Sequence, residues 1–438
     1  MRIKNKRFLV YGLGSSGVSV IQRLLECKAK IFLLDKDVDK LKDLVVKFKV
    51  NAYEDGDKID VVIVSPGISK DDEFILSAKG KGVKIISELE FGYLLNRKAK
   101  YVAVTGTNGK TTTVNLLNHI LSKEMQCKML GNVGVPLTTE KDYKDTIVLE
   151  VSSFQLEFID KFRPHISVIL NLAPDHLDRY QDEKEYYSFK KRIAKNSKND
   201  ILILNADDKN IMTSDFTNCN IYHLSINKFI KRGVYLYNNI IYFVDGGKSI
   251  EILSIQDISL VGVHNIYNVM ACVCVSKLLN IDPVVIKESV KSFKGLPHRF
   301  EFVTHHNGVT IINDSKATNI ASVISAMQSI SLNSHILLGG SDKGEDFTNL
   351  FKLHLPYKYY LYGATANKIY KAACECDMQD KCVVFDTMFD CVRMAIEMAK
   401  EGQMIVLCPG CASFDAFKNY EDRGEQFKNF VRSFYEKK

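Results

Sequence analysis

The residues best suited to chemistry lie in one stretch, 105–113, which reads Thr-Gly-Thr-Asn-Gly-Lys-Thr-Thr-Thr. An apolar run at 101–104 precedes it, and a segment with helical periodicity follows it to about Lys123. A glycine-containing turn between a strand and a helix presents backbone N–H groups and the positive helix end to an anion. The spacing, GTNGKT, is shorter than the general GxxxxGK(S/T) pattern. The predicted nucleotide contacts in this loop are Gly106, Thr107, Asn108, Gly109, Lys110, Thr111 and Thr112.

Within that loop we expect Lys110 to neutralise the β- and γ-phosphates and the Thr111 hydroxyl to reach Mg²⁺.

Acidic and histidine side chains end the strands that follow. Glu150 closes an apolar run at 146–149, and Asp175 and His176 come shortly after the run at 166–170. The carboxyl ends of parallel strands meet at the sheet edge where ligands bind, and carboxylates suit Mg²⁺ beside phosphates. Glu150 is therefore predicted to hold Mg²⁺, with His176 in the same crevice, although a histidine is more often a core or surface residue.

Composition sets limits on the class of protein. The chain has 438 residues, 46% hydrophobic and 25% charged, which is typical of a globular protein of two or three domains. Its net charge of +7 is spread along the chain without a Lys/Arg run, so we expect no nucleic-acid arm. No apolar run is long enough to span a membrane, and residues 1–7 lead straight into a strand, so no signal peptide is expected.

The cysteines indicate a reducing compartment. There are 11, an odd number, mostly within apolar segments, which predicts free thiols in a cytoplasmic protein. Cys408 and Cys411 form a CxxC, but no second Cys or His pair accompanies it at zinc-like spacing. A metal or redox role for this pair is therefore a weak alternative.

The elements that must position these residues fall into three segments. In the first, 1–97, a strand at 7–11 leads into Gly-Leu-Gly-Ser-Ser-Gly at 12–17, and a second strand at 30–34 ends at Asp35. This arrangement is the dinucleotide-fold fingerprint and indicates a Rossmann-like sheet, but alone it says little about NAD. A later strand at 60–64 ends in Ser65-Pro66-Gly67-Ile68, which is either a ligand-binding strand end or a plain tight turn.

The other two segments also alternate strands and helices. Segment 98–297 contains the phosphate loop in a P-loop ATPase-type parallel sheet, and β-rich runs at about 219–254 with Asn238-Asn239 predict a small antiparallel appendage. Segment 298–438 begins with a hairpin signal at Asn307-Gly308 and continues as a second Rossmann-like sheet. The predicted fold class is α/β in three domains, with bounds 1–97, 98–297 and 298–438.

Several motifs together resemble a known family, the Mur ligases, and within it the members that add D-glutamate. The resemblance covers the chain in order and is more specific than any single motif. The run NDSKATN separates the D-glutamate-adding members from their relatives. The motifs are GLG at 12–14, SPGI at 65–68, GTNGKTT at 106–112, GNVG at 131–134, EVSSFQL at 150–156, DHLD at 175–178, GVHNIYN at 262–268, GLPHRFE at 295–301, NDSKATN at 313–319 and CASFD at 411–415.

The resemblance implies a cytoplasmic, monomeric ligase that uses ATP and two Mg²⁺ ions and binds neither membrane nor nucleic acid. ATP would phosphorylate the alanyl carboxylate of UDP-N-acetylmuramoyl-L-alanine, and D-glutamate would attack the acyl phosphate to give an amide. A carbamylated lysine would serve as the bridging ligand of the second metal. The resemblance assigns this role to Lys190, because Ile193 then keeps the family's spacing, with Lys191 as the alternative. The implied metal ligands are Thr111, Glu150, His176 and Lys190, and the implied catalytic residues are Lys110, His176 and Lys190.

The resemblance also implies substrate contacts. Asn268 would face the adenine or ribose, Arg299 would reach the γ-phosphate and Asp314 would hold the ribose, whereas Asn132 would contact the muramoyl substrate. Lys36 and Asp37 depart from the Thr-Arg of some relatives, which leaves the uracil contacts open. The implied uridine-end contacts are Gly14, Asp35, Ser65 and Gly67. The implied D-glutamate pocket is Lys316, Thr318, Lys343, Ser413 and Tyr420, where the family commonly has Phe at the last position.

Three alternatives remain. One is another member of the superfamily, such as folylpolyglutamate synthase or a Mur ligase for a different amino acid, which should diverge at 313–319 and 411–415. A dehydrogenase using 12–17 for NAD would leave the loop at 109–111 and Glu150 unexplained. A non-catalytic nucleotide-binding module would leave the charged strand ends without a role.

Overall fold

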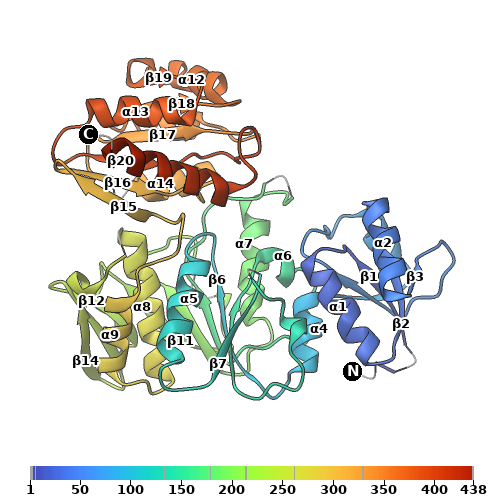
Figure 1. Cartoon of the computed structure of the whole chain (residues 1–438). Coiled ribbons are helices and arrows are strands. Elements are labelled where there is room, and N and C mark those ends of the chain that lie inside the picture. Colours follow the sequence, from blue (N-terminus) through green and yellow to red (C-terminus); the bar gives the residue numbers. More distant parts are fainter. Residues whose placement is uncertain are drawn as a thin grey trace. The chain divides into compact units, whose positions relative to one another are not determined.

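The computed structural model describes residues 3–4, 6–132, 134–177, 179–212, 215–260, 262–327, 330–342 and 344–436. Over these residues the chain forms three parallel-dominated sheets covered by helices, so the α/β class is confirmed (Figure 1). The chain divides into two compact units, Met1–Asp257 with Tyr267–Ser292, and Ile258–Ile266 with Phe293–Lys438. The predicted domain bounds remain predictions.

The first sheet is the predicted Rossmann-like sheet. Its strand order is β3-β2-β1-β4-β5 with every pair parallel. Two buried clusters cover its faces because alternate residues of each strand point to opposite sides. The strands are β1 (Arg7–Tyr11), β2 (Lys30–Leu34), β3 (Asn51–Ala52), β4 (Val61–Val64) and β5 (Lys84–Ser87), and the helices are α1 (Ser15–Glu26), α2 (Val38–Phe48), α3 (Glu73–Gly80) and α4 (Glu88–Leu95).

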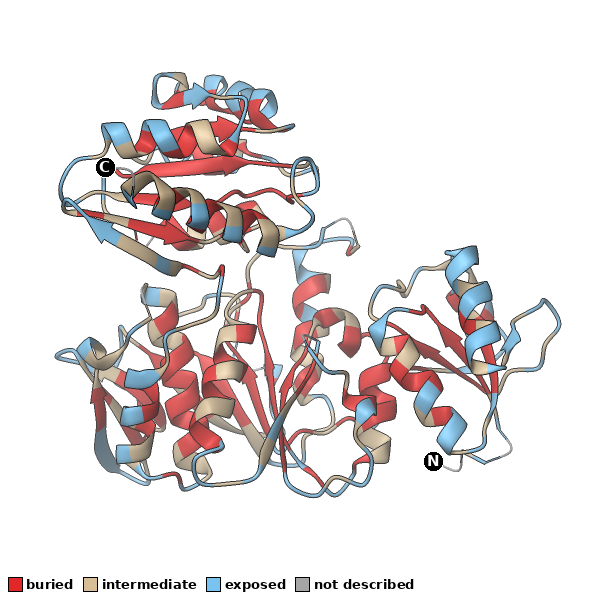
Figure 2. Cartoon of the chain, in the orientation of Figure 1, coloured by how far each residue is buried: buried red, intermediate tan, exposed pale blue. Residues whose placement is uncertain are grey.

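The central sheet has the strand order β14-β13-β12-β11-β10-β9-β6-β8-β7. In Figure 2 its inner strands are buried, whereas the helices that cover it turn exposed faces outward. The strands are β6 (Lys100–Thr105), β7 (Cys127–Gly131), β8 (Thr146–Glu150), β9 (Ile166–Ile169), β10 (Asp200–Asn205), β11 (Cys219–Ser225), β12 (Gly233–Tyr237), β13 (Ile240–Asp245) and β14 (Lys248–Ser254). The helices are α5 (Lys110–Leu121), α6 (Ser153–Leu156), α7 (Glu183–Lys191), α8 (Val263–Leu278) and α9 (Pro283–Ser292).

The run at about 219–254, predicted as a small antiparallel appendage, lies at one end of the central sheet. The Asn238-Asn239 turn is present, with positive φ at both residues, and β12, β13 and β14 are antiparallel. However, β11 and β12 are parallel to the strands before them, and the whole run extends the edge of the central sheet. Strand patterning and turn residues indicate a hairpin, but they do not indicate which edge of a sheet the hairpin extends.

Carboxylates of α4 join the first sheet to the central one inside the first unit. Glu90, which is fully buried, accepts hydrogen bonds from the backbone N–H groups of residues 160–162 at 2.9–3.0 Å. Glu88 accepts from both the N–H and the hydroxyl of Thr138 at 2.8 Å. The bonds to Glu90 satisfy a carboxylate that would otherwise be costly to bury. The second Glu88 oxygen, Oε2, is buried without a hydrogen-bond partner among the described residues.

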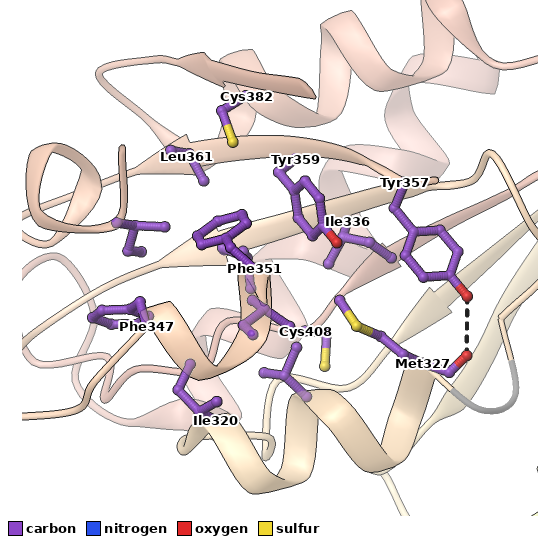
Figure 3. Close-up of a cluster of buried hydrophobic side chains, with 14 of the residues drawn as sticks. Ile320, Met327, Ile336, Phe347, Phe351, Tyr357, Tyr359, Leu361, Cys382 and Cys408 are labelled. Carbon is purple, nitrogen blue, oxygen red and sulfur yellow. Dashed lines mark hydrogen bonds between the residues drawn. The ribbon is translucent and has the colours of Figure 1, made fainter. Parts of the chain in front are cut away.

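The third sheet has the order β15-β16-β20-β17-β18-β19, and the predicted Asn307-Gly308 hairpin joins β15 to β16. Helices α10, α11 and α12 supply side chains to a buried cluster on one face, shown in Figure 3, and α13 and α14 supply them to a cluster on the other. The strands are β15 (Glu301–His306), β16 (Val309–Asn313), β17 (His335–Gly339), β18 (Lys358–Tyr362), β19 (Cys382–Val384) and β20 (Met404–Leu407). The helices are α10 (Ile320–Met327), α11 (Thr348–Phe351), α12 (Ala366–Cys374), α13 (Met388–Met398) and α14 (Tyr420–Glu436).

The state of the cysteines and the hydropathy of the helices were both addressed by the sequence. All eleven cysteines lie among the described residues, and each is a free thiol. Burial raises the pKa of the Cys411 thiol to about 11 and that of Cys408 well above its usual range, so neither is poised to react as a thiolate. Across the described parts of the chain, helices long and apolar enough to cross a membrane are absent.

Candidate active site

The phosphate loop connects β6 to α5, as predicted. Gly109 is the N-cap of α5 with φ of +85°, a left-handed conformation that suits glycine. A side chain here would collide with Asn268, since a Cβ would lie 2.4 Å from the Asn268 Oδ1. The same Oδ1 accepts a hydrogen bond from Thr113 Oγ1 at 3.2 Å. Asn268 therefore supports the phosphate end of the loop, and its predicted contact with adenine or ribose stays a prediction.

The loop is also tied to the strand end beside it through Asn171, which the sequence analysis missed. The Asn171 backbone carbonyl accepts from Thr107 N–H at 3.0 Å, and its side-chain oxygen accepts from Asn108 N–H at 2.8 Å. Two of the loop's N–H groups are thus used to hold the loop in shape. The signal available in the sequence was only the position of Asn171 two residues after the end of β9.

Lys110 begins α5, and its ammonium lies over the loop. Nζ donates to the carbonyl oxygens of Gly106 and Thr107, both at 2.8 Å. Thr111 and Thr112 follow in the first turn of the helix, where the N–H groups and the helix dipole favour an anion. Lys110 and the Thr111 hydroxyl, the predicted phosphate and Mg²⁺ contacts, therefore lie at the same end of α5.

Glu150 is the last residue of β8 and is only 2% exposed. Its Oε1 accepts a hydrogen bond from Asn132 Nδ2 at 3.0 Å, which brings two predicted residues together. Its Oε2 is buried, and no hydrogen-bond partner for it exists among the residues that the structure describes. A buried carboxylate oxygen without a partner is costly. A hard cation would satisfy it, so this residue fits the predicted Mg²⁺.

The structure separates the two candidate lysines. Lys190 is 1% exposed, donates from Nζ to the Gly106 carbonyl at 2.9 Å, and lies 4.5 Å from the Tyr186 ring centroid. Burial, and then the nearby Lys110 charge, hold the pKa of Lys190 well below its usual value. Lys191 instead pairs with Asp215 at 2.6 Å near the surface. Of the two, only Lys190 contacts the phosphate loop.

His176 lies on the loop after β9 with φ of +55° and a side chain 45% exposed. Its ring packs edge-on against Phe154, with centroids 4.8 Å apart, and its Nε2 is 3.6 Å from an oxygen of Asp175. Asp178 lies outside the described residues. Within the described ranges no three His, Cys, Asp or Glu side chains form a ready metal cluster. The predicted metal ligands therefore include two residues of other types, Thr111 and Lys190, in addition to Glu150 and His176.

Arg179, which the sequence analysis did not identify, joins this loop to the first sheet. Its guanidinium forms a bidentate pair with Glu157 at 2.8–2.9 Å, and the Glu157 side chain is fully buried. Its Nη1 and Nη2 also donate to the carbonyls of Pro66 and Ile68 at 2.8 and 2.7 Å. A planar fork with several donors suits such a junction. The loop at 65–68 is therefore fastened to the His176 loop.

The predicted uridine-end residues gather at the carboxyl ends of β1, β2 and β4. Ser65 Oγ donates to the Gly12 carbonyl at 2.6 Å, and Asp35 accepts from the N–H groups of Leu13 and Asp37. Gly14 is the N-cap of α1, and Gly67 follows β4. Lys36 and Asp37, the two residues that depart from some relatives, also make contacts in this region. Asp37 caps α2, and Lys36 lines a cavity of about 640 Å³ and pairs with Asp72 at 3.4 Å.

In the second unit, Asp314 directly follows β16. Its Oδ1 accepts from the Phe300 N–H at 3.1 Å, and burial raises its pKa to about 6 despite the opposing pull of Arg299. The two predicted nucleotide contacts of this unit are therefore electrostatic neighbours. Positive φ values at His298 and Phe300 bend the chain around Arg299.

The predicted amino-acid pocket lies on loops at one edge of the third sheet. The Lys316 ammonium lies 3.8 Å from the Tyr420 ring centroid, so these two come together. Ser413 is buried and Thr318 half-buried on the loops after β20 and β16. Lys343, the remaining predicted member, lies outside the described residues. Sequence reasoning missed Arg423, a buried residue of α14 that contacts these loops.

Profiles of one family match all three segments of the chain. The Mur ligase MurD-like N-terminal domain matches residues 6–87 and the Mur ligase middle domain matches 104–276. The glutamate ligase domain of Mur ligases matches residues 298–411.

Curated relatives match over nearly full length. UDP-N-acetylmuramoylalanine--D-glutamate ligase of Clostridioides difficile (strain 630) is 38% identical, with 99% of this chain and 100% of that protein covered. The protein of the same name from Thermoanaerobacter pseudethanolicus is 36% identical, with 98% and 99% covered.

Solved structures share the fold at lower identity. A pseudomurein peptide ligase type C from Methanothermus fervidus has a TM-score of 0.60 at 18% identity, with 98% of this chain and 100% of that one covered. MurF ligase from Thermotoga maritima, solved in complex with ADP, has a TM-score of 0.60 at 16% identity, with 98% and 96% covered.

Fold, site and sequence together define an ATP-dependent carbon–nitrogen ligase, and this chain belongs to the Mur ligase family. The relatives that match it at 36–38% identity are D-glutamate ligases by name. Family membership leaves no support for the dehydrogenase and non-catalytic alternatives. It also accounts for the phosphate loop and the charged strand ends together.

Proposed function

We propose that this protein adds D-glutamate to UDP-N-acetylmuramoyl-L-alanine through an acyl phosphate, in the cytoplasmic steps of peptidoglycan precursor synthesis, and that it acts as a monomer. The convergence of Lys110 and Lys190 on the phosphate loop is the observation that carries the proposal. The names of the full-length relatives and the NDSKATN run support D-glutamate as the amino acid.

In the first half-reaction the alanyl carboxylate oxygen attacks the γ-phosphorus of ATP, the bond to the β-phosphate oxygen breaks, and ADP leaves. Two anions must meet, so fixed positive charge at the site is the main requirement. Lys110 would exchange its carbonyl contacts for phosphate oxygens. Bound Mg²⁺ would supply further charge neutralisation, and Thr111 and Glu150 are the residues placed to hold it.

In the second half-reaction the amine of D-glutamate attacks the acyl carbon, loses a proton and displaces phosphate. We assign Lys316, Thr318, Lys343, Ser413 and Tyr420 to binding the amino acid, because a dicarboxylate needs cations and hydroxyl donors. Arg299, Asp314 and Asn268 are proposed nucleotide contacts. Gly14, Asp35, Ser65, Gly67 and Asn132 are proposed contacts of the UDP-linked substrate.

Lys190 is proposed to carry a carbamate. The neutral amine attacks CO₂, a nitrogen–carbon bond forms, and one proton is released. A pKa held well below the usual value favours the neutral, nucleophilic form of this amine, which supports the assignment over Lys191. The product is a carboxylate beside Lys110, which would serve with His176 as a ligand for the second Mg²⁺.

Phosphate release from ATP tests the proposal directly. The purified chain is given UDP-N-acetylmuramoyl-L-alanine with D-Glu, L-Glu, L-Lys or D-Ala, and Lys110→Ala serves as the inactive control. Release with D-Glu alone is the expected result. Release with a different amino acid would keep the ligase mechanism and reassign the specificity, and absence of release with all four would overturn the proposed acceptor.

A further inference from the structure

Arg423 is a large side chain that is fully buried, with 0% of its surface exposed. It lies in the first turn of α14, where the helix dipole disfavours a cation. A buried guanidinium is tolerated only when its donors are satisfied. The fold must therefore supply hydrogen-bond acceptors for this side chain.

The Arg423 donors are all used. Nε donates to the Ser315 hydroxyl at 3.0 Å, and Nη2 donates to the Ser315 and Cys411 carbonyls at 2.9 and 3.1 Å. Nη1 donates to the Ala412 and Gly339 carbonyls at 3.1 and 3.5 Å. An arginine has five N–H groups in a planar fork, and these contacts within the described residues engage each of them.

The acceptors belong to the loops that leave β16 and β20 and to the last residue of β17, and these three strands are adjacent in the sheet. The first loop carries Lys316 and Thr318, and the second carries Ser413. Ser315 also donates from its hydroxyl to the Tyr420 carbonyl at 2.8 Å, which ties the start of α14 to the same loop. One side chain thus holds the backbone beneath the pocket residues.

We propose that Arg423 is a positioning residue that sets the spacing of the pocket loops and thereby the affinity for the amino-acid substrate. This inference rests on the proposed function, which assigns those loops to amino-acid binding. Small displacements of binding groups reduce rates by large factors. Lysine cannot replace Arg423, since a single ammonium cannot span carbonyls on two loops and the end of β17.

The test separates the two half-reactions. Hydroxylamine attacks an acyl phosphate without needing an amino-acid pocket, so hydroxamate formation reports ATP use, and KM for D-glutamate reports the pocket. We expect Arg423→Lys and Arg423→Met to raise KM for D-glutamate by about tenfold or more. Hydroxamate formation and KM for ATP should change by less than about threefold. Arg393→Met, at an exposed arginine of α13, is the matched control and should leave all three values unchanged.

Ser315→Ala provides a second, milder variant in case the Arg423 variants do not fold. It removes the Nε acceptor and the hydroxyl's bond to the Tyr420 carbonyl and keeps the four carbonyl contacts of Arg423, so a rise of about threefold in KM for D-glutamate is expected. An unchanged KM for D-glutamate in the folded variants would overturn the inference, as would equal losses in both half-reactions. If the wild-type chain uses another amino acid, the proposed function fails on its own, and the same variants are compared with that amino acid.

Discussion

Lys110 and Lys190 donate to the same backbone oxygen, the Gly106 carbonyl, at 2.8 and 2.9 Å. Two ammonium groups sharing one acceptor repel each other, and Lys190 is also removed from water. Burial, and then the repulsion from Lys110, hold the pKa of Lys190 well below its usual value. This pair also places an amine whose neutral form is favoured next to a fixed cation, which suits a lysine that becomes an anion by modification.

The Lys190 assignment predicts a sharp contrast with its neighbour. Lys190→Ala should lose about a hundredfold or more of kcat, because a metal ligand and its charge are removed. Lys191→Ala should stay within about twofold, since it loses only a surface pair with Asp215. Steady-state phosphate release measures both.

A carboxylate added from solution provides the control for the lysine pair. Acetate or formate should restore part of the activity of Lys190→Ala and leave Lys191→Ala unaffected. Equal losses in the two variants, or no response to carboxylates, would contradict the carbamate assignment.

Glu150→Gln should weaken Mg²⁺ binding without weakening the fold. The glutamine oxygen can still accept from Asn132, whereas the buried oxygen without a partner loses its charge. We expect about tenfold more Mg²⁺ for half-maximal activity and an unchanged or higher thermal midpoint. A Mg²⁺ titration and a thermal melt of the same sample check this, and an unchanged titration would remove Glu150 from the metal site.

Arg179 and Glu157 should behave as a coupled pair. Arg179→Met leaves a buried carboxylate unpaired and is expected to cost about 3 kcal/mol of unfolding free energy. Adding Glu157→Gln should recover part of that loss, because the uncompensated charge is gone. Urea unfolding of the two single variants and the double variant measures the coupling, and simple additivity would contradict it.

Asp314 should make stability depend on pH between about 4 and 6. Its pKa is near 6 in the folded chain and near 3.8 when unfolded, so the folded state binds more protons in that window. Its contribution is fully present below pH 3.8 and is lost as pH rises through 6, by at most about 3 kcal/mol. Asp314→Asn should lack this loss in urea unfolding from pH 4 to 7, and the exposed Asp386→Asn should retain it.

Much of the fold could be predicted from local patterns. The bounds of β1 and β2 follow from short apolar runs, and the turns at Asn238-Asn239 and Asn307-Gly308 follow from asparagine and glycine within a few residues. The antiparallel strands β12 to β14 were predicted, whereas the parallel pairing of β11 with β12 and the edge that the run joins depend on the rest of the sheet.

The sequence by itself determined the phosphate loop, the three α/β segments and the family, because these depend on residue types at short, fixed spacings. Tertiary structure decided which lysine faces the loop and which arginines hold the site together. Lys190 meets a carbonyl 84 positions away, and Arg423 meets a hydroxyl 108 positions away. Such contacts set burial, and burial sets the pKa of Lys190, the unpartnered oxygen of Glu150 and the need to satisfy Arg423.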